Sequence, residues 1–131
     1  MTKEFIYSVK VYYEDTDAGG VVYYSNYLKF FERARTEAIN SLNLSNKLLL
    51  EKYGVLIVVK SCKIEYKKSA KLEDEIIIIS TLKSITKTSF VMKQIVKLGN
   101  DLITEAEIHL VTVNKNGKPT KIPKILSDGL N

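Results

Sequence analysis

Cysteine and histidine are almost absent from this chain of 131 residues, which has one of each, Cys62 and His109. One cysteine allows no disulfide within the chain. One thiolate and one imidazole are also too few for a zinc cluster held by a single copy. We therefore expect neither a disulfide framework nor a metal site.

Long apolar runs and a secretory signal are also missing. No run approaches the roughly 18 apolar residues of a spanning helix, and the first residues, MTKEFIYSVK, alternate instead of forming the apolar core of a signal peptide. Apolar residues make up 45% and charged residues 27% of the chain, a balance typical of soluble globular domains. We expect one cytoplasmic domain over residues 1–131, without a transmembrane segment.

Several enzyme motifs are absent too. No G-x-S-x-G occurs, which disfavours a serine hydrolase, and neither phosphate-binding glycine motif appears. The net charge of +5 comes mostly from lysine, and could attract nucleic acid, an acidic membrane or a phosphorylated small molecule. Nucleic acid fits poorly, because the tyrosines concentrate between Tyr7 and Tyr27, beside an acidic loop, rather than among the basic residues.

Hydrophobic periodicity predicts a strand and then a helix in the first third of the chain. From Phe5 to Tyr13 every odd position is apolar or aromatic, the period of a half-buried strand. After the turn-rich EDTDAGG, Ser25 and Asn26 are candidate helix caps. A helix over about residues 26–42 is indicated by apolar residues at spacings of three and four: Phe31, Ala34, Ala38 and Leu42.

Beyond a short helix over Asn46–Tyr53, ended by Gly54, the remaining patterns are typical of strands. The predicted strands are Val55–Tyr66, Glu75–Ser84, Thr88–Leu98 and Leu102–Val113. Short polar connections predict an antiparallel meander of neighbours. The fold class is therefore α+β, a five-stranded antiparallel sheet curled around one long helix. The tail, residues 120–131, has no clear period and is expected to be loosely held.

The segment richest in chemical groups is the loop before the long helix, with Glu14, Asp15 and Asp17 beside two glycines. The first N–H groups of a helix can hold a developing oxyanion, while a carboxylate nearby serves as base or nucleophile. The same aspartates could simply shape a turn, and the pattern alone leaves both interpretations open.

Residues 12–35, YYEDTDAGGVVYYSNYLKFFERAR, resemble the signature of the 4-hydroxybenzoyl-CoA thioesterase family, especially its branch associated with the Tol-Pal system. The resemblance lies in the D-T-D-x-x-G-x-V-Y core, the Asn26–Tyr27 pair and the run Glu32–Arg35, and chain length and strand order agree. It implies a hotdog fold and hydrolysis of an acyl-CoA, with coenzyme A as part of the substrate and no separate cofactor.

The resemblance also implies roles for particular residues. The catalytic carboxylate falls on Asp17, acting as general base or as nucleophile. The amide that polarises the thioester carbonyl falls on the backbone N–H of about Tyr24. Tyr13 matches a position that assists the site, although an aromatic residue ending a strand is also typical of a core. Gly20 and Asn26 of the motif are assigned to substrate binding.

Further binding residues follow from the same resemblance. The phosphates of coenzyme A are expected at the turn between the third and fourth strands and in the last turn. The pantetheine arm is expected along the strand after the helix, between two subunits, which implies a homodimer or a homotetramer. The residues concerned are Lys83, Lys87, Thr88 and Lys118 for the phosphates, and Val58, Val59 and Lys60 for the pantetheine. Each lysine could equally be a solvated surface residue.

One departure from the Tol-Pal branch is Tyr24, where that branch usually has histidine, so substrate preference stays open. His109 cannot replace that imidazole, because it shares the polar face of the last strand with Glu105 and Glu107. A hotdog dehydratase is disfavoured because it would need a histidine in the site. Alternatives that remain are an acyl-binding module and an acyl carrier protein as partner. The acyl group could be short, long or aromatic.

Overall fold

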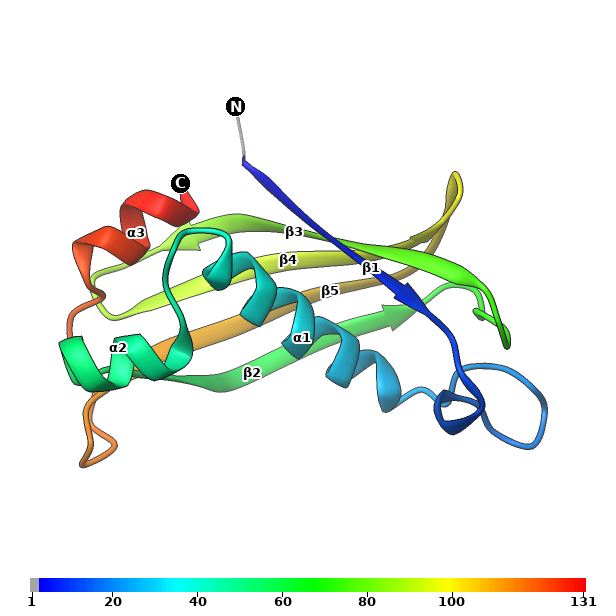
Figure 1. Ribbon diagram of the computed structural model, residues 1–131, viewed down its shortest axis with the longest axis horizontal. Helices are drawn as coiled ribbons and strands as arrows, with labels where there is room; N and C mark the ends of the chain where they lie inside the picture. Colours follow the sequence, from blue (N-terminus) through cyan, green and yellow to red (C-terminus); the bar gives the residue numbers. More distant parts are fainter. Residues whose placement is uncertain (1–2) are drawn as a thin grey trace.

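The computed structural model describes residues 3–131. Its sheet lies against one long helix, α1, which crosses one face (Figure 1). The elements in chain order are β1 (Glu4–Lys10), the 3-10 turn η1 (Tyr13–Asp15), α1 (Asn26–Asn40), α2 (Asn46–Tyr53), β2 (Leu56–Tyr66), β3 (Glu75–Ile85), β4 (Ser89–Leu98), β5 (Asp101–Val113) and α3 (Lys124–Leu130). The predicted α+β class and the hotdog arrangement of five strands around one helix are confirmed.

The strand order is β1-β3-β4-β5-β2, with every pair antiparallel. The hairpins β3–β4 and β4–β5 agree with the predicted meander, but β2 pairs with β5 and not with its neighbour in sequence, β3. The connection 67–74 is not a hairpin, because it carries the buried Ala70 and binds the acidic loop: Val22 N–H donates to Ala70 O over 2.9 Å. As a result β1 and β2 are the two edges of the sheet.

The core lies between α1 and the face of the sheet that it crosses. The helix buries residues at spacings of three and four, as the periodicity predicted, and each central strand buries every second side chain. The fully buried large side chains include Phe30 and Phe31 of α1, Ile76 and Ile78 of β3, Met92 of β4, and Ile103 and Ile108 of β5. Aromatic and branched side chains of the helix and of the sheet pack against each other, and this packing fixes the position of the first turn of α1.

The first strand ends earlier than predicted. β1 stops at Lys10, and Tyr13 lies in η1 with 80% of its surface exposed, so the alternative that Tyr13 belongs to the core is wrong for this chain. The reason is local. The Asp15 carboxylate accepts a hydrogen bond from Tyr12 N–H over 2.9 Å, which folds the chain into a turn before the alternation can continue.

The C-terminal tail is not loosely held, and that expectation is wrong. Residues 124–130 form α3, and Ile122, Leu126 and Leu130 are buried. The tail is also tied to the β3–β4 turn, since Ile122 N–H donates to Lys87 O over 2.8 Å. Its apolar residues recur every four positions, but two turns of helix are too short for this period to stand out. Within residues 3–131 no helix is long and apolar enough to cross a membrane.

Candidate active site

The acidic loop forms a closed turn around Asp17. The Asp17 N–H donates to Val21 O over 2.9 Å, and its C=O accepts from Gly20 N–H over 3.0 Å. Gly20 has a φ of 78°, in the left-handed region that glycine adopts without strain, which is what this turn requires. One carboxylate oxygen of Asp17, Oδ1, accepts from Gly19 N–H over 2.8 Å. Among the residues that the structure describes, Oδ2 accepts no hydrogen bond, and the side chain is exposed.

Asp15 has a different task, because it joins the loop to α1. Its backbone C=O accepts from Tyr23 N–H over 2.9 Å and from the Asn26 side-chain amide over 2.8 Å. The Asn26 side chain therefore fixes the first turn of the helix to the acidic loop. The predicted capping by Ser25 or Asn26 oxygens is not what the structure shows, since Ser25 makes no side-chain cap bond. Asp15 is thus a structural anchor, whereas the Asp17 side chain faces solvent.

The start of α1 offers an N–H group beside this loop. Asn26 N–H and Tyr27 N–H are used in the first turn, but no hydrogen bond within residues 3–131 uses the Tyr24 N–H. Such N–H groups at a helix start carry the positive end of the helix dipole. The Tyr24 N–H is therefore available to an oxygen of a ligand, on the same loop and helix start that position Asp17.

Tyrosines surround this helix start. The ring centroids of Tyr23 and Tyr24 are 4.8 Å apart, and Tyr66, at the end of β2, lies 6.2 Å from Tyr24 and 5.8 Å from Tyr27. The Tyr66 hydroxyl donates to Tyr24 O over 3.3 Å. The hydrogen bond with Tyr24 raises the pKa of Tyr23, and burial raises the pKa of Tyr66 and Tyr27. The phenols of Tyr23, Tyr27 and Tyr66 are therefore neutral near pH 7.

Tyr66 was not among the residues predicted from sequence. It is the last residue of β2 and its side chain lies on the helix side of the sheet, since it pairs with the buried Thr104. The alternation within β2 would have placed it on that side, but nothing in the sequence indicated that the end of β2 meets the start of α1. That meeting depends on the strand order.

The other predicted binding residues do not gather around Asp17 within one chain. The acidic loop lies at the end of the sheet where β2 finishes, whereas the β3–β4 turn and the segment after β5 lie at the opposite end (Figure 1). Lys87, Thr88 and Lys118 are at that opposite end, and Lys83 forms an ion pair with Glu107. Val58, Val59 and Lys60 are exposed on the edge strand β2, with Lys60 at a β-bulge.

His109 lies where its alternation placed it, with Glu107 on the face of the sheet opposite the buried Ile108 and Leu110. His109 lies away from the acidic loop, because it pairs with Val91 on the central strands of the sheet. No group of three His, Cys, Asp or Glu side chains within residues 3–131 is arranged to hold a metal ion.

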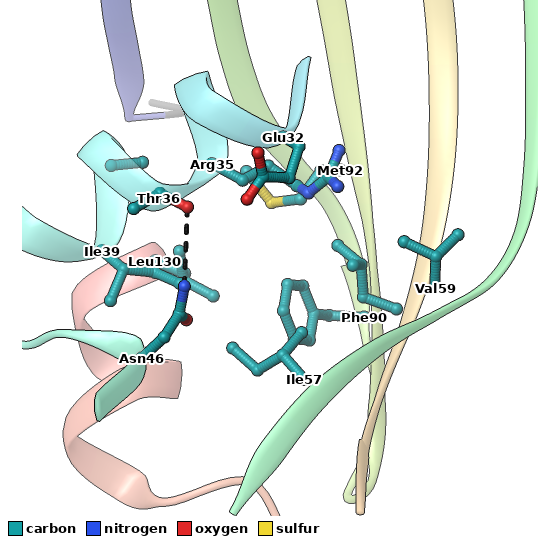
Figure 2. A pocket seen from close by; sticks show the side chains of 12 residues that line it. Glu32, Arg35, Thr36, Ile39, Asn46, Ile57, Val59, Phe90, Met92 and Leu130 are labelled. Carbon is teal, nitrogen blue, oxygen red and sulfur yellow. Dashed lines mark hydrogen bonds between the residues drawn. The ribbon is translucent and has the colours of Figure 1, made fainter. Parts of the chain in front are cut away.

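A cavity of about 160 Å³ opens between α1, α2 and the sheet, and it does not include Asp17. Figure 2 shows it from close by, with Glu32 and Arg35 beside Met92, and with Thr36 and Asn46 joined by a hydrogen bond of 3.5 Å on another side. Apolar side chains form the rest of the wall: Ala38, Ile39, Ile57, Val59, Phe90, Leu110 and Leu130. Nothing in the sequence indicated a cavity at Arg35.

Comparison with known proteins agrees with this geometry. The model of the thioesterase-like superfamily matches residues 11–130. A protein of Escherichia coli O6:H1 named acyl-CoA thioester hydrolase YbgC is 42% identical over 125 residues, covering 94% of this chain and 92% of that protein. A probable thioesterase from Bartonella henselae, known as a crystal structure, superposes with a TM-score of 0.88 at 28% identity, covering 94% of this chain and all of that one.

A solved 4-hydroxybenzoyl-CoA thioesterase has the same fold, with a TM-score of 0.86 at 19% identity, covering 98% of this chain and 99% of that one. The fold and the loop before α1 define a hotdog enzyme that acts on thioesters. The chain belongs to the thioesterase-like superfamily. The resemblance seen in residues 12–35 is confirmed, and so is the prediction of a thioesterase.

Proposed function

We propose that this protein hydrolyses the thioester bond of an acyl-CoA, with Asp17 as the catalytic carboxylate and the Tyr24 N–H polarising the carbonyl. The observation that supports this most is that a carboxylate oxygen and a helix-start N–H, both without a hydrogen-bond partner within residues 3–131, lie on one loop closed by backbone hydrogen bonds. The relative named acyl-CoA thioester hydrolase supports acyl-CoA as the substrate.

In the proposed reaction the thioester carbonyl oxygen accepts a hydrogen bond from the Tyr24 N–H, which stabilises the negative charge that develops there. Asp17 Oδ2 then takes a proton from water, which attacks the carbonyl carbon, or attacks that carbon itself to form a mixed anhydride. In both routes the carbon–sulfur bond breaks and coenzyme A leaves as its thiolate. In the second route water hydrolyses the anhydride and restores Asp17. Tyr13, exposed on η1, and Gly20 of the turn lie on the same loop.

The protein is proposed to act as a homodimer or a homotetramer. β2 is an edge strand eleven residues long, and an exposed, apolar edge is a template for pairing with another strand. Its exposed apolar side chains include Leu56, Val58, Val59 and Tyr66. Pairing of β2 with its copy across a two-fold axis would place the partner's opposite end, with its Lys87, Thr88 and Lys118, on the side of Asp17. Coenzyme A would then lie between two subunits.

Thiol release from acyl-CoAs of increasing chain length, together with benzoyl-CoA, tests this proposal. Asp17→Asn keeps the bond that Gly19 N–H donates but removes the base and nucleophile, so kcat should fall by about 100- to 10,000-fold. Glu14→Gln is the matched control, because Glu14 is an exposed carboxylate of the same loop, and it should retain activity. Full activity of Asp17→Asn in a folded oligomer would contradict the proposal.

Two further parts of the proposal are the carrier of the acyl group, coenzyme A, and the location of the protein in the cell. The lysine-rich surface could also bind an acidic acyl carrier protein, so each acyl group is offered both on coenzyme A and on a carrier protein. Turnover only from the carrier protein would replace coenzyme A in the proposal, and binding without turnover from either would favour an acyl-binding module. A cytoplasmic location stays a prediction, tested by cell fractionation.

A further inference from the structure

The cavity beside α2 is built for a small ligand group. Its volume of about 160 Å³ is close to that of engineered cavities of about 150 Å³ that hold benzene, so it fits a group of about six carbon atoms. Phe90, Ile57 and Leu110 are among the apolar side chains of its wall. A group that enters this cavity is therefore largely apolar.

Arg35 changes the chemistry of the cavity at one point. It donates from Nη1 to the Gln94 side-chain oxygen over 2.9 Å, and this is its one hydrogen bond within residues 3–131. A guanidinium has five N–H donors, and no carboxylate of the described chain lies within ion-pair distance of it. Burial lowers the pKa of Arg35, and the nearby Glu32, which is exposed, raises it by less. The cavity thus contains a half-buried cation with unused donors.

The cavity lies too far from Asp17 of its own chain to receive the acyl group held there. Glu32, the lining residue of α1 nearest to the helix start, is eight residues beyond Tyr24, about 12 Å along a helix. Along β2, Val59 of the cavity and Tyr66 of the catalytic end are seven residues apart, about 23 Å. A six-carbon acyl chain has five carbon–carbon bonds of about 1.5 Å each and cannot cover either distance.

A two-fold pairing of β2 strands removes this separation. Antiparallel pairing of an edge strand with its own copy places the Tyr66 end of one strand beside the Leu56–Val59 end of the other. Tyr66 and Val59 both lie on the helix side of the sheet, since they pair with the buried Thr104 and Leu110. The catalytic end of one copy then faces the cavity of the other.

We propose that the cavity around Arg35 receives the acyl group activated at Asp17 of the partner copy, and that Arg35 selects an acyl group of about six carbons with an anionic far end. This inference rests on the proposed function and names its substrate class, a half-thioester of a dicarboxylic acid. Arg35 is a specificity residue, because its guanidinium binds the far carboxylate and takes no part in breaking the thioester.

The first test compares adipoyl-CoA with hexanoyl-CoA, which share a six-carbon chain and differ by the terminal carboxylate. Wild type should show a kcat/KM for adipoyl-CoA about 10-fold or more above that for hexanoyl-CoA, and Arg35→Met should lower this ratio by about 10- to 100-fold, the range for a hydrogen bond to a charged group. Arg33→Met, an exposed arginine of the same helix, should leave the ratio unchanged.

The ratio separates specificity from a structural role. If Arg35 served only to hold Gln94, both substrates would lose activity equally, and an unchanged ratio would overturn the proposal. If Arg35→Met does not fold, Arg35→Lys, which keeps the charge but loses the forked geometry, replaces it. A wild-type preference for hexanoyl-CoA would overturn the proposal without any variant.

The Asp17→Asn protein separates this inference from the proposed hydrolysis. Calorimetry on Asp17→Asn, alone and combined with Arg35→Met, gives the Kd of both acyl-CoAs without turnover. If wild type hydrolyses neither these two substrates nor any other acyl-CoA of the panel above, the proposed function fails, while tighter binding of adipoyl-CoA that depends on Arg35 would still support the selecting role. Equal Kd values would overturn it.

Mixed dimers test the placement across subunits. Coexpression of differently tagged Asp17→Asn and Arg35→Met chains yields heterodimers in which one site has both Asp17 and Arg35 only if the two residues come from different copies. Adipoyl-CoA selectivity should therefore return at one of the two sites. A heterodimer with no more selectivity than Arg35→Met alone would show that the cavity does not serve the partner.

Discussion

Replacing Leu126 by alanine tests whether the C-terminal tail is part of the folded domain. Leu126 lies in α3 with 0% of its surface exposed. Truncating a buried leucine to alanine leaves a cavity that collapses only in part, and it lowers the free energy of unfolding by about 2–5 kcal/mol. A tail that is loosely held would lose less than about 0.5 kcal/mol. Since 1 kcal/mol shifts the Tm of a chain of this length by about 3–5 °C, the predicted decrease in Tm is about 6–25 °C.

Ile125→Ala is the matched control, because Ile125 is adjacent in the same helix but 48% exposed, and its Tm should change by less than about 3 °C. Urea denaturation monitored by circular dichroism gives the free energies, with all proteins at one concentration because oligomers are stabilised by mass action. A seven-residue helix could also detach instead of leaving a cavity, which would limit the loss to its docking energy. Equal, small shifts for both variants would refute the packing argument.

Three further predictions follow from single contacts. Gln94→Leu removes the side-chain amide that donates to Ser80 Oγ over 2.9 Å and to Phe31 O over 3.0 Å and that accepts from Arg35, and should lower the free energy of unfolding in urea by about 2–4 kcal/mol; a neutral result would contradict this. Asn26→Ala releases the helix start from Asp15 and should reduce kcat/KM in the thiol-release assay by about 10- to 100-fold while Tm changes little; unchanged kinetics would mean that this bond does not position the site. The hydrogen bond from Lys83 lowers the pKa of Glu107, so its stabilisation is present above the ordinary glutamate pKa and is lost as pH falls through the lowered value. Lys83→Met should therefore lower the urea midpoint at pH 7 and have a progressively smaller effect as pH falls below the ordinary glutamate pKa, and an equal effect at every pH would exclude the ion pair as the cause.

Local patterns predicted most of the secondary structure, because each strand and helix has its own period. The helix predicted around Asn46–Tyr53, with Gly54 after it, has these bounds in the structure, because glycine readily adopts the left-handed conformation that ends many helices. The pairing of β2 with β5 was not predicted. It depends on how residues 67–74 pack across the end of the helix, and this is a property of the whole fold.

The candidate site also has some residues that local sequence predicted and others that depend on the whole fold. The D-T-D motif indicated the Asp17 loop, because the turn is made by residues close together in sequence. Tyr66 and the cavity at Arg35 could not be predicted, because the first needs the strand order and the second needs the gap between α1 and the edge of the sheet. Only the structure shows that, within residues 3–131, no carboxylate forms an ion pair with the Arg35 guanidinium.

The N–H at position 24 belongs to the main chain, and this has an evolutionary consequence. Every residue except proline supplies that N–H, so the side chain at this position can change while the hydrogen-bond donor stays where Asp15 and Asn26 hold the backbone. The Tyr24 side chain, which packs against Tyr66, forms instead part of the wall of the site. A lineage could therefore exchange histidine for tyrosine here and acquire new substrates without rebuilding the group that is proposed to polarise the carbonyl.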